Sequence, residues 1–133
     1  LKALFYEFFY EMFAGNYIIT TDAEQNRNLL SVKKVLEYIS IHYREPLSVK
    51  ELSGISNYSE FYFMKLFKQY TGKTAAAYLN DYRLEKAKSL LLHTDNSVTD
   101  IAIEVGFNNT SYFIKKFQEA NQISPHKFRK KMS

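Results

Sequence analysis

Two segments of the sequence carry lysine, hydroxyl and apolar side chains at matching helical positions. Lys65 follows Phe61 by four residues, and Lys115 follows Ser111 by four residues. In each segment, large apolar side chains repeat at the spacing of a helix face that packs against the core, which leaves the lysines on the opposite face. These apolar positions are Phe63, Leu66, Phe67, Phe113 and Phe117. Lysine and hydroxyl groups suit acceptors on DNA base edges, and apolar groups suit thymine methyls. Each segment therefore fits a helix that reads the major groove or, alternatively, an amphipathic helix with a solvated basic face.

Each segment opens with a residue that commonly caps the start of a helix. Ser59 precedes the first segment and Asn109 precedes the second. Serine and asparagine are both favoured N-cap residues. The first turn of a helix has unpaired amide groups and a partial positive charge. Both predicted helix starts are therefore suitable binding sites for backbone phosphates.

The two segments belong to a longer internal repeat. SVKEL at Ser48 reappears as SVTDI at Ser97, 49 residues later, and the YF pair at Tyr62 reappears at Tyr112, 50 residues later. The second copy therefore has one extra residue between its two helices. In each copy a short capped helix, a turn and a second helix follow one another, which is the order of a helix-turn-helix.

Capping and turn residues set the predicted bounds of these elements. The first copy has a short helix from Ser48 to about Ser56 and then the turn Asn57-Tyr58. The second copy has a short helix over 99–105 and then the turn Gly106-Phe107. Between the copies, residues 75–92 show a long helical pattern, which predicts a helix that acts as a semi-rigid spacer.

Two further helices are predicted before the repeat. Leu1–Phe13 has an amphipathic pattern that ends at Gly15, and a second pattern runs from Leu29 and stops before Pro46. The polar stretch Thr20–Asn28 predicts a linker or a poorly ordered loop. The predicted divisions are 1–28 (N-terminal helix and linker), 29–74 (first helix-turn-helix subdomain), 75–93 (linker helix) and 94–133 (second helix-turn-helix subdomain).

Composition narrows the class of protein. The 133 residues, 46% of them apolar, suffice for one compact domain or two small subdomains. The chain has no cysteine, and His42, His93 and His126 lack the spacing of metal ligands, so we expect a reducing, intracellular setting and no metal. No apolar run approaches the roughly 20 residues that span a bilayer. We therefore expect a cytoplasmic protein without membrane contact.

The net charge of +4 is unevenly distributed along the chain. Residues 1–59 hold six Lys/Arg against seven Asp/Glu, whereas residues 60–133 hold twelve against seven. The basic half contains both lysine-bearing segments. A basic balance of this kind favours a nucleic-acid partner, although a solvated charged surface is the simpler alternative.

Two other classes of function are open on these residues. An adaptor would bind proteins through the helix pairs and the N-terminal apolar helix. Its affinity would be nearly insensitive to salt, whereas binding to duplex DNA weakens steeply as salt rises. An enzyme has little support, because the four glycines form no phosphate loop and no histidine has an evident nucleophile partner.

From about Leu29 to Arg129 the sequence resembles the DNA-binding domain of AraC/XylS transcription regulators. The resemblance rests on the order and spacing of the runs LSVKEL, SNYSEFYFMKLFKQYTGKT, YLNDYRLEKAKSLL, VTDIAIEVGFNNTSYFIKKFQ and SPHKFRK. It implies an all-α, homeodomain-like fold of two tandem helix-turn-helix subdomains and a linker helix, with an extra N-terminal amphipathic helix. It also implies a sequence-specific transcription regulator, not an enzyme. Its recognition helices, about 60–70 and 110–120, would enter successive major grooves centred about 34 Å apart.

The resemblance assigns roles to individual residues. The implied base readers are Phe61, Met64, Lys65, Thr110, Ser111, Ile114 and Lys115. The implied phosphate contacts are Ser59, Tyr62, Lys68, Asn109, Tyr112 and Lys116. The implied partner is double-stranded DNA, with RNA polymerase added for an activator, and the implied location is the nucleoid. No catalytic residue, cofactor or metal is implied.

Some positions call for a different interpretation. Arg83 and Arg129 are expected to form structural ion pairs or caps rather than to read bases. Leu1–Phe13 resembles the end of the family's sensor and dimerisation domain. We expect it to self-associate or dock, with residual core packing as the alternative.

The first copy departs from the family's pattern in its scaffold helix and in its readers. Gly54 lies inside the short helix, where it costs about 1 kcal/mol relative to alanine, and Ser53 replaces the usual alanine. The first subdomain is therefore expected to be softer. Phe61 and Met64 cannot hydrogen-bond to bases, so readout by the first copy is expected to depend on methyl contacts and DNA shape.

Overall fold

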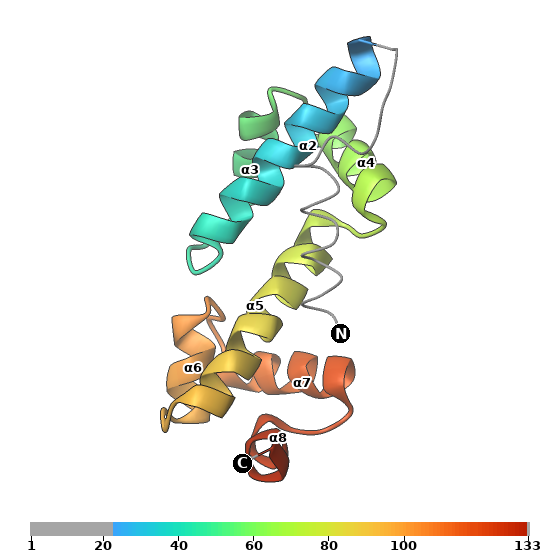
Figure 1. The fold of residues 1–133 in the computed structure, drawn as a ribbon. Helices are drawn as coiled ribbons and strands as arrows, with labels where there is room; N and C mark the ends of the chain where they lie inside the picture. Colours follow the sequence, from blue (N-terminus) through green and yellow to red (C-terminus); the bar gives the residue numbers. More distant parts are fainter. Residues whose placement is uncertain (1–22, 133) are drawn as a thin grey trace. The chain divides into compact units, whose positions relative to one another are not determined.

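The computed structural model describes residues 23–132 of the chain, and the predicted N-terminal helix Leu1–Phe13 lies outside them. The described part is helical, without a strand (Figure 1). Its helices are α2 (Ala23–His42), α3 (Val49–Ser56), α4 (Glu60–Thr71), α5 (Ala75–His93), α6 (Val98–Glu104), α7 (Thr110–Asn121) and α8 (Pro125–Met132). The all-α prediction and the order of the helices from the repeat onward are confirmed.

The helices form two compact units. Within the described residues, unit 1 consists of 23–42 and 47–78, and unit 2 consists of 43–46 and 79–132. In unit 1, α2, α3 and α4 pack against one another, and in unit 2, α7 packs against α6 and α8. The predicted linker helix is present as α5, but it is shared: its first residues belong to unit 1 and the rest to unit 2.

The start of α2 differs from the prediction. Residues 23–28, predicted as part of a linker, are helical. This segment is polar, but Asn28 is buried, and its side chain forms hydrogen bonds with the hydroxyls of Tyr58 and Tyr62. A polar residue whose hydrogen bonds are made inside the fold has the same sequence signature as a solvated one, so polarity alone gives the wrong assignment.

The helix-turn-helix of unit 1 has the predicted caps. The Ser48 hydroxyl accepts a hydrogen bond from the Glu51 amide at 3.1 Å, which starts α3. The helix ends at Asn57, whose left-handed φ of 63° lets the chain turn sharply. Asparagine tolerates this conformation better than most residues that carry a Cβ.

The core of unit 1 is built on the predicted apolar face of α4. Phe63 and Phe67 are fully buried, with ring centroids 5.7 Å apart, and Phe67 meets the edge of Tyr78 at 5.6 Å. The other core side chains come from α2, α3 and α4 and include Val32, Val35, Leu36, Ile39, Leu52 and Leu66. Burial of this stripe fixes which side of α4 is left for solvent or a ligand.

Unit 2 repeats this arrangement with a longer connection between its two helices. The Ser97 hydroxyl accepts from the Asp100 amide at 3.0 Å, and α6 begins at Val98, one residue before the prediction. The turn reverses at Gly106, whose φ is 109°. Asn108 is the extra residue predicted from the change in repeat spacing, and it precedes the N-cap Asn109 of α7.

Gly106 is needed for close packing as well as for its backbone conformation. A Cβ at this position would lie 2.7 Å from Nε of Arg83 and 2.8 Å from the carbonyl oxygen of Tyr43. Arg83 is buried and donates to the carbonyl oxygens of Tyr43 at 2.7 Å and Glu45 at 2.8 Å. The turn of unit 2 is therefore packed directly against a buried, hydrogen-bonded arginine.

Both arginines that were predicted to be structural have structural contacts. Arg129 of α8 donates to the carbonyl oxygens of Leu91 at 3.0 Å and Thr94 at 3.2 Å, which satisfies groups at the end of α5. Burial lowers the pKa of Arg83. These hydrogen bonds support the prediction that Arg83 and Arg129 have a structural role and do not read bases.

Candidate nucleic-acid interface

The exposed face of α4 lies opposite its buried phenylalanines, as predicted. Phe61 is 81% exposed and Met64 is 49% exposed. Lys65 and Lys68 are exposed on the same helix. The structure thus brings large apolar groups together with ammonium groups on the side of α4 that faces away from the core.

The corresponding face of α7 has a different chemical character. Ser111 and Lys115 are exposed, whereas Thr110 and Ile114 are half-buried. The buried side of α7 holds Phe113 and Phe117, with ring centroids 5.8 Å apart. This face therefore offers hydroxyl and ammonium groups around one partly covered aliphatic side chain.

The residues that open both helices are N-caps. The Ser59 hydroxyl accepts from the Tyr62 amide at 3.2 Å, and Oδ1 of Asn109 accepts from the Tyr112 amide at 3.0 Å. Each cap satisfies one of the first-turn amides that lack a partner within the helix. Contact with an anion at these ends would then involve the remaining amides and the positive end of the helix dipole.

The predicted phosphate contacts Tyr62, Tyr112 and Lys116 have partners within their own unit. Each tyrosine hydroxyl accepts a hydrogen bond from an asparagine amide, Asn28 to Tyr62 at 3.2 Å and Asn80 to Tyr112 at 3.3 Å. Nζ of Lys116 lies 3.5 Å from the Glu119 carboxylate and 5.5 Å from the centre of the Tyr112 ring. The sequence prediction missed both asparagines, although each lies on the helix that precedes a helix-turn-helix.

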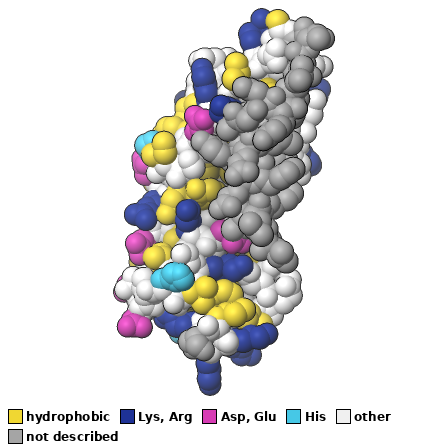
Figure 2. All heavy atoms as spheres, viewed as in Figure 1, with side chains coloured by type: hydrophobic (Ala, Val, Ile, Leu, Met, Phe, Trp, Pro, Cys, Tyr) yellow, Lys and Arg dark blue, Asp and Glu magenta, His cyan; other side chains and the backbone are white. Residues whose placement is uncertain are grey.

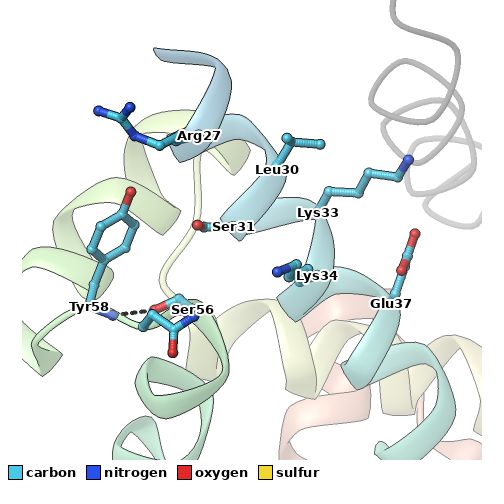
Figure 3. Close-up of a pocket in the computed structure, with 9 residues that line it drawn as sticks. Arg27, Leu30, Ser31, Lys33, Lys34, Glu37, Ser56 and Tyr58 are labelled. Atoms are coloured by element: carbon cyan, nitrogen blue, oxygen red, sulfur yellow. Dashed lines mark hydrogen bonds between the residues drawn. The ribbon is translucent and has the colours of Figure 1, made fainter. Parts of the chain in front are cut away.

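A basic hollow of about 530 Å³ lies in unit 1 between α2 and the α3–α4 turn. In Figure 3 the side chains of Arg27, Lys33 and Lys34 project from α2, and the turn brings Tyr58 to the other side. The amide of Tyr58 donates to the Ser56 hydroxyl at 3.3 Å and fixes the turn at this point. The seven-residue spacing of Arg27 and Lys34, which puts them on one helix face, was the available sequence signal for this feature.

Helix α8 carries the densest basic sequence of the described chain. Its cationic residues are Lys127, Arg129, Lys130 and Lys131. Figure 2 shows Lys and Arg side chains around α8 at the bottom of the view. The sequence prediction gave Arg129 a structural role and assigned this segment no contact with a ligand.

Within residues 23–132, no group of three or more His, Asp and Glu side chains is placed to hold a metal ion. Over the same residues, no helix combines the length and the apolar character needed to cross a membrane.

Comparison with known proteins supplies the family context. The family model described as "Helix-turn-helix domain" matches residues 52–131. The regulatory protein PocR of Salmonella typhimurium is 37% identical over 102 residues, which are 77% of this chain and 34% of that protein. The chain spans about a third of the length of the first curated relatives that it matches.

Solved structures share the fold. One is the DNA-binding domain of AdpA in complex with a target DNA, with a TM-score of 0.73 and 25% identity, covering 76% of this chain and 91% of that one. Another is a probable AraC family transcriptional regulator from Rhodopseudomonas palustris, with a TM-score of 0.71 and 25% identity, covering 77% of this chain and 97% of that one. The structural likeness therefore extends over both units.

Proposed function

Because the chain belongs to the AraC-type helix-turn-helix family, we propose that it is the sequence-specific, double-stranded-DNA-binding part of a transcription regulator. The observation that carries this proposal is the repeated build of α4 and α7. Each is N-capped, buries a phenylalanine pair and exposes lysine on the opposite face. A capped helix with one buried stripe and one basic face has the shape and charge to enter a major groove.

In this proposal α4 and α7 enter successive major grooves of one duplex. The base-reading residues are Phe61, Met64, Lys65, Thr110, Ser111, Ile114 and Lys115. The phosphate contacts are the two helix N-termini at Ser59 and Asn109, with Tyr62, Lys68, Tyr112 and Lys116. Phosphate contacts fix position and orientation, and base contacts select the sequence.

Equilibrium binding to random-sequence duplex and to a single strand of equal length tests this function. We expect preference for the duplex and an affinity that falls steeply between 50 and 200 mM salt, because bound lysines release counterions. Equal affinity for the single strand would contradict duplex recognition. Binding that does not change with salt would instead indicate an adaptor that docks through apolar surface.

The wider role of the protein is also a proposal. We propose a regulator rather than an enzyme, acting at the nucleoid in the cytoplasm without a cofactor, with RNA polymerase as a partner where it activates. Self-association through Leu1–Phe13 is proposed from the amphipathic pattern of that segment. Replacing Phe5, Phe8 and Met12 with polar residues should then reduce self-association in analytical ultracentrifugation and leave binding to a single site intact. Unfolding of residues 29–129 in that variant would contradict this role.

A further inference from the structure

An asparagine–tyrosine hydrogen bond occurs at the same place in both units. In unit 1, Nδ2 of Asn28 on α2 lies 3.2 Å from the Tyr62 hydroxyl on α4. In unit 2, Nδ2 of Asn80 on α5 lies 3.3 Å from the Tyr112 hydroxyl on α7. Each hydrogen bond joins the helix that precedes a helix-turn-helix to the second helix of that helix-turn-helix. The second helix of each unit is therefore held at an equivalent residue.

The two tyrosines occupy equivalent positions in their helices. Tyr62 is the third residue after the cap Ser59, and Tyr112 is the third residue after the cap Asn109. The amide of each tyrosine donates to its cap. Both phenols therefore stand on the first turn, where the helix dipole favours an anion.

The direction of the hydrogen bond decides what the phenol has left to offer. A phenol oxygen can accept a hydrogen bond and donate its own proton at the same time. In unit 1, Oδ1 of Asn28 accepts from the Tyr58 hydroxyl, so the Asn28 side chain presents its NH₂ group to Tyr62. Tyr62 thus accepts from Asn28 and keeps its proton for another acceptor.

Neighbouring side chains restrict both tyrosine rings. The Tyr62 ring meets Tyr58 edge to face, with ring centroids 4.8 Å apart. The Tyr112 ring lies 6.1 Å from Phe107, which occupies the position in the unit 2 turn that Tyr58 occupies in the unit 1 turn. An aromatic neighbour and an asparagine donor therefore orient each phenol before any ligand is present.

We propose that Asn28 and Asn80 are positioning residues that hold the Tyr62 and Tyr112 hydroxyls as hydrogen-bond donors to two backbone phosphates of duplex DNA. This inference rests on the proposed function and names the part of that interface that selects position rather than sequence. An O–H donor to a phosphate oxygen makes a short, charge-assisted hydrogen bond. A contact of this kind adds the same affinity on every sequence.

The test is a double-mutant cycle in unit 2, because Asn80 is only half-buried and its replacement leaves the core in place. Affinities of the full chain, Asn80→Ala, Tyr112→Phe and the double variant are measured on a selected duplex and on a random duplex. Each single change should weaken binding about two- to tenfold on both duplexes. In the Tyr112→Phe background, Asn80→Ala should change affinity by less than about twofold, because its effect passes through the hydroxyl.

Asn80→Asp provides a sharper variant at the same position. A carboxylate can only accept, so it would draw the Tyr112 proton inward and turn the phenol lone pairs toward the phosphate. We expect a larger loss than for Asn80→Ala, and the part of it that depends on Tyr112 should vanish in Tyr112→Phe. The loss of affinity that remains in the Tyr112→Phe background measures the effect of the added charge alone.

A scan of single methylphosphonate substitutions identifies the phosphate itself. One methylphosphonate substitution should weaken the binding of the wild-type chain to DNA about two- to tenfold and leave the affinity of the Asn80→Ala variant unchanged. The inference would be overturned if the loss of affinity caused by Asn80→Ala added in full to the loss caused by Tyr112→Phe and to the loss caused by every methylphosphonate. The proposed DNA binding would not be affected by that result. A wild-type chain that binds no duplex would overturn the proposed function and this inference with it.

Discussion

The second helices of the two units are alike on their buried sides and different on their exposed sides. The phenylalanine pairs of α4 and α7 are fully buried and have ring separations of 5.7 and 5.8 Å. On the exposed sides, Phe61 corresponds to Ser111 in the repeat, and Met64 corresponds to Ile114. The packing face of a repeated helix is fixed by its core, whereas its outer face is free to differ. We therefore expect unit 2 to contribute hydrogen-bonded sequence readout and unit 1 to contribute methyl contacts and positioning.

The turns of the two units differ in how closely they are packed. Asn57 turns the chain of unit 1 with a φ of 63°, whereas Gly106 does so in unit 2 with a φ of 109°. Gly106 lies directly against Arg83 and the Tyr43 carbonyl, where a Cβ has no space. The same turn is thus open to a side chain in one unit and closed to it in the other.

Exchanging the turn residues should give the largest effect. Gly106→Asn, which copies the unit 1 residue into unit 2, should lower the free energy of unfolding by more than about 3 kcal/mol. The reason is that the new Cβ would displace the buried Arg83. The reverse change, Asn57→Gly, should alter it by only a few tenths of a kcal/mol. Urea unfolding of both variants measures the difference, and similar losses would mean that the two turns are packed alike.

The paired lysines separate base reading from phosphate contact. Lys115→Ala should cost about 1–3 kcal/mol on a selected site and relax the base preference in one groove, because Ser111 and Ile114 complete a mixed reading face. Lys65→Ala should relax the base preference less and weaken binding more evenly across sequences, because its neighbours Phe61 and Met64 cannot hydrogen-bond.

Measuring both lysine variants against a library of sites decides between these roles. Unchanged base preference in both grooves for both variants would contradict the assignment of readers. Base preference lost only in Lys65→Ala would reverse the roles of the two units.

The apolar face of α4 predicts a dependence on thymine methyl groups. Replacing thymine with uracil in the half-site of unit 1 should weaken binding about three- to fourfold for each methyl group that is contacted, at about 0.8 kcal/mol per buried methyl-sized group. Phe61→Ser, which copies the corresponding residue of α7, should remove this sensitivity. The same uracil replacement in the half-site of unit 2 is the control and should have a smaller effect. Equal sensitivity of both half-sites would remove the proposed difference between the faces.

The smallest effect is expected at Gly54 in α3. A Cβ at this position meets nothing within 4 Å, and the equivalent position of α6 carries Ile103, which is 62% exposed. Gly54→Ala should therefore raise the free energy of unfolding by about 0.5–1 kcal/mol through helix propensity and leave DNA affinity unchanged. Thermal unfolding detects the shift, and a destabilised variant would show that the short helix of unit 1 is not limited by this glycine.

Sequence reasoning located the repeat because caps and core stripes are local signals. Ser59, Asn109 and the buried phenylalanines follow directly from helical spacing and capping preference. The sequence did not predict the start of α2, the hydrogen bonds from the Asn28 and Asn80 side chains to tyrosine hydroxyls, or the packing of Arg83 on Gly106. Each of these joins residues 23 or more positions apart, and a satisfied buried polar group has no distinctive pattern along the chain.

Footprinting on a selected duplex tests the central claim most directly, namely that both α4 and α7 enter DNA. We expect protection over roughly 16–20 base pairs, with two major-groove contacts one helical turn apart on one face of the duplex. Lys65→Ala and Lys115→Ala should each weaken protection in a different groove. Protection of a single groove by the wild-type chain, unaffected by one of the two substitutions, would contradict the account.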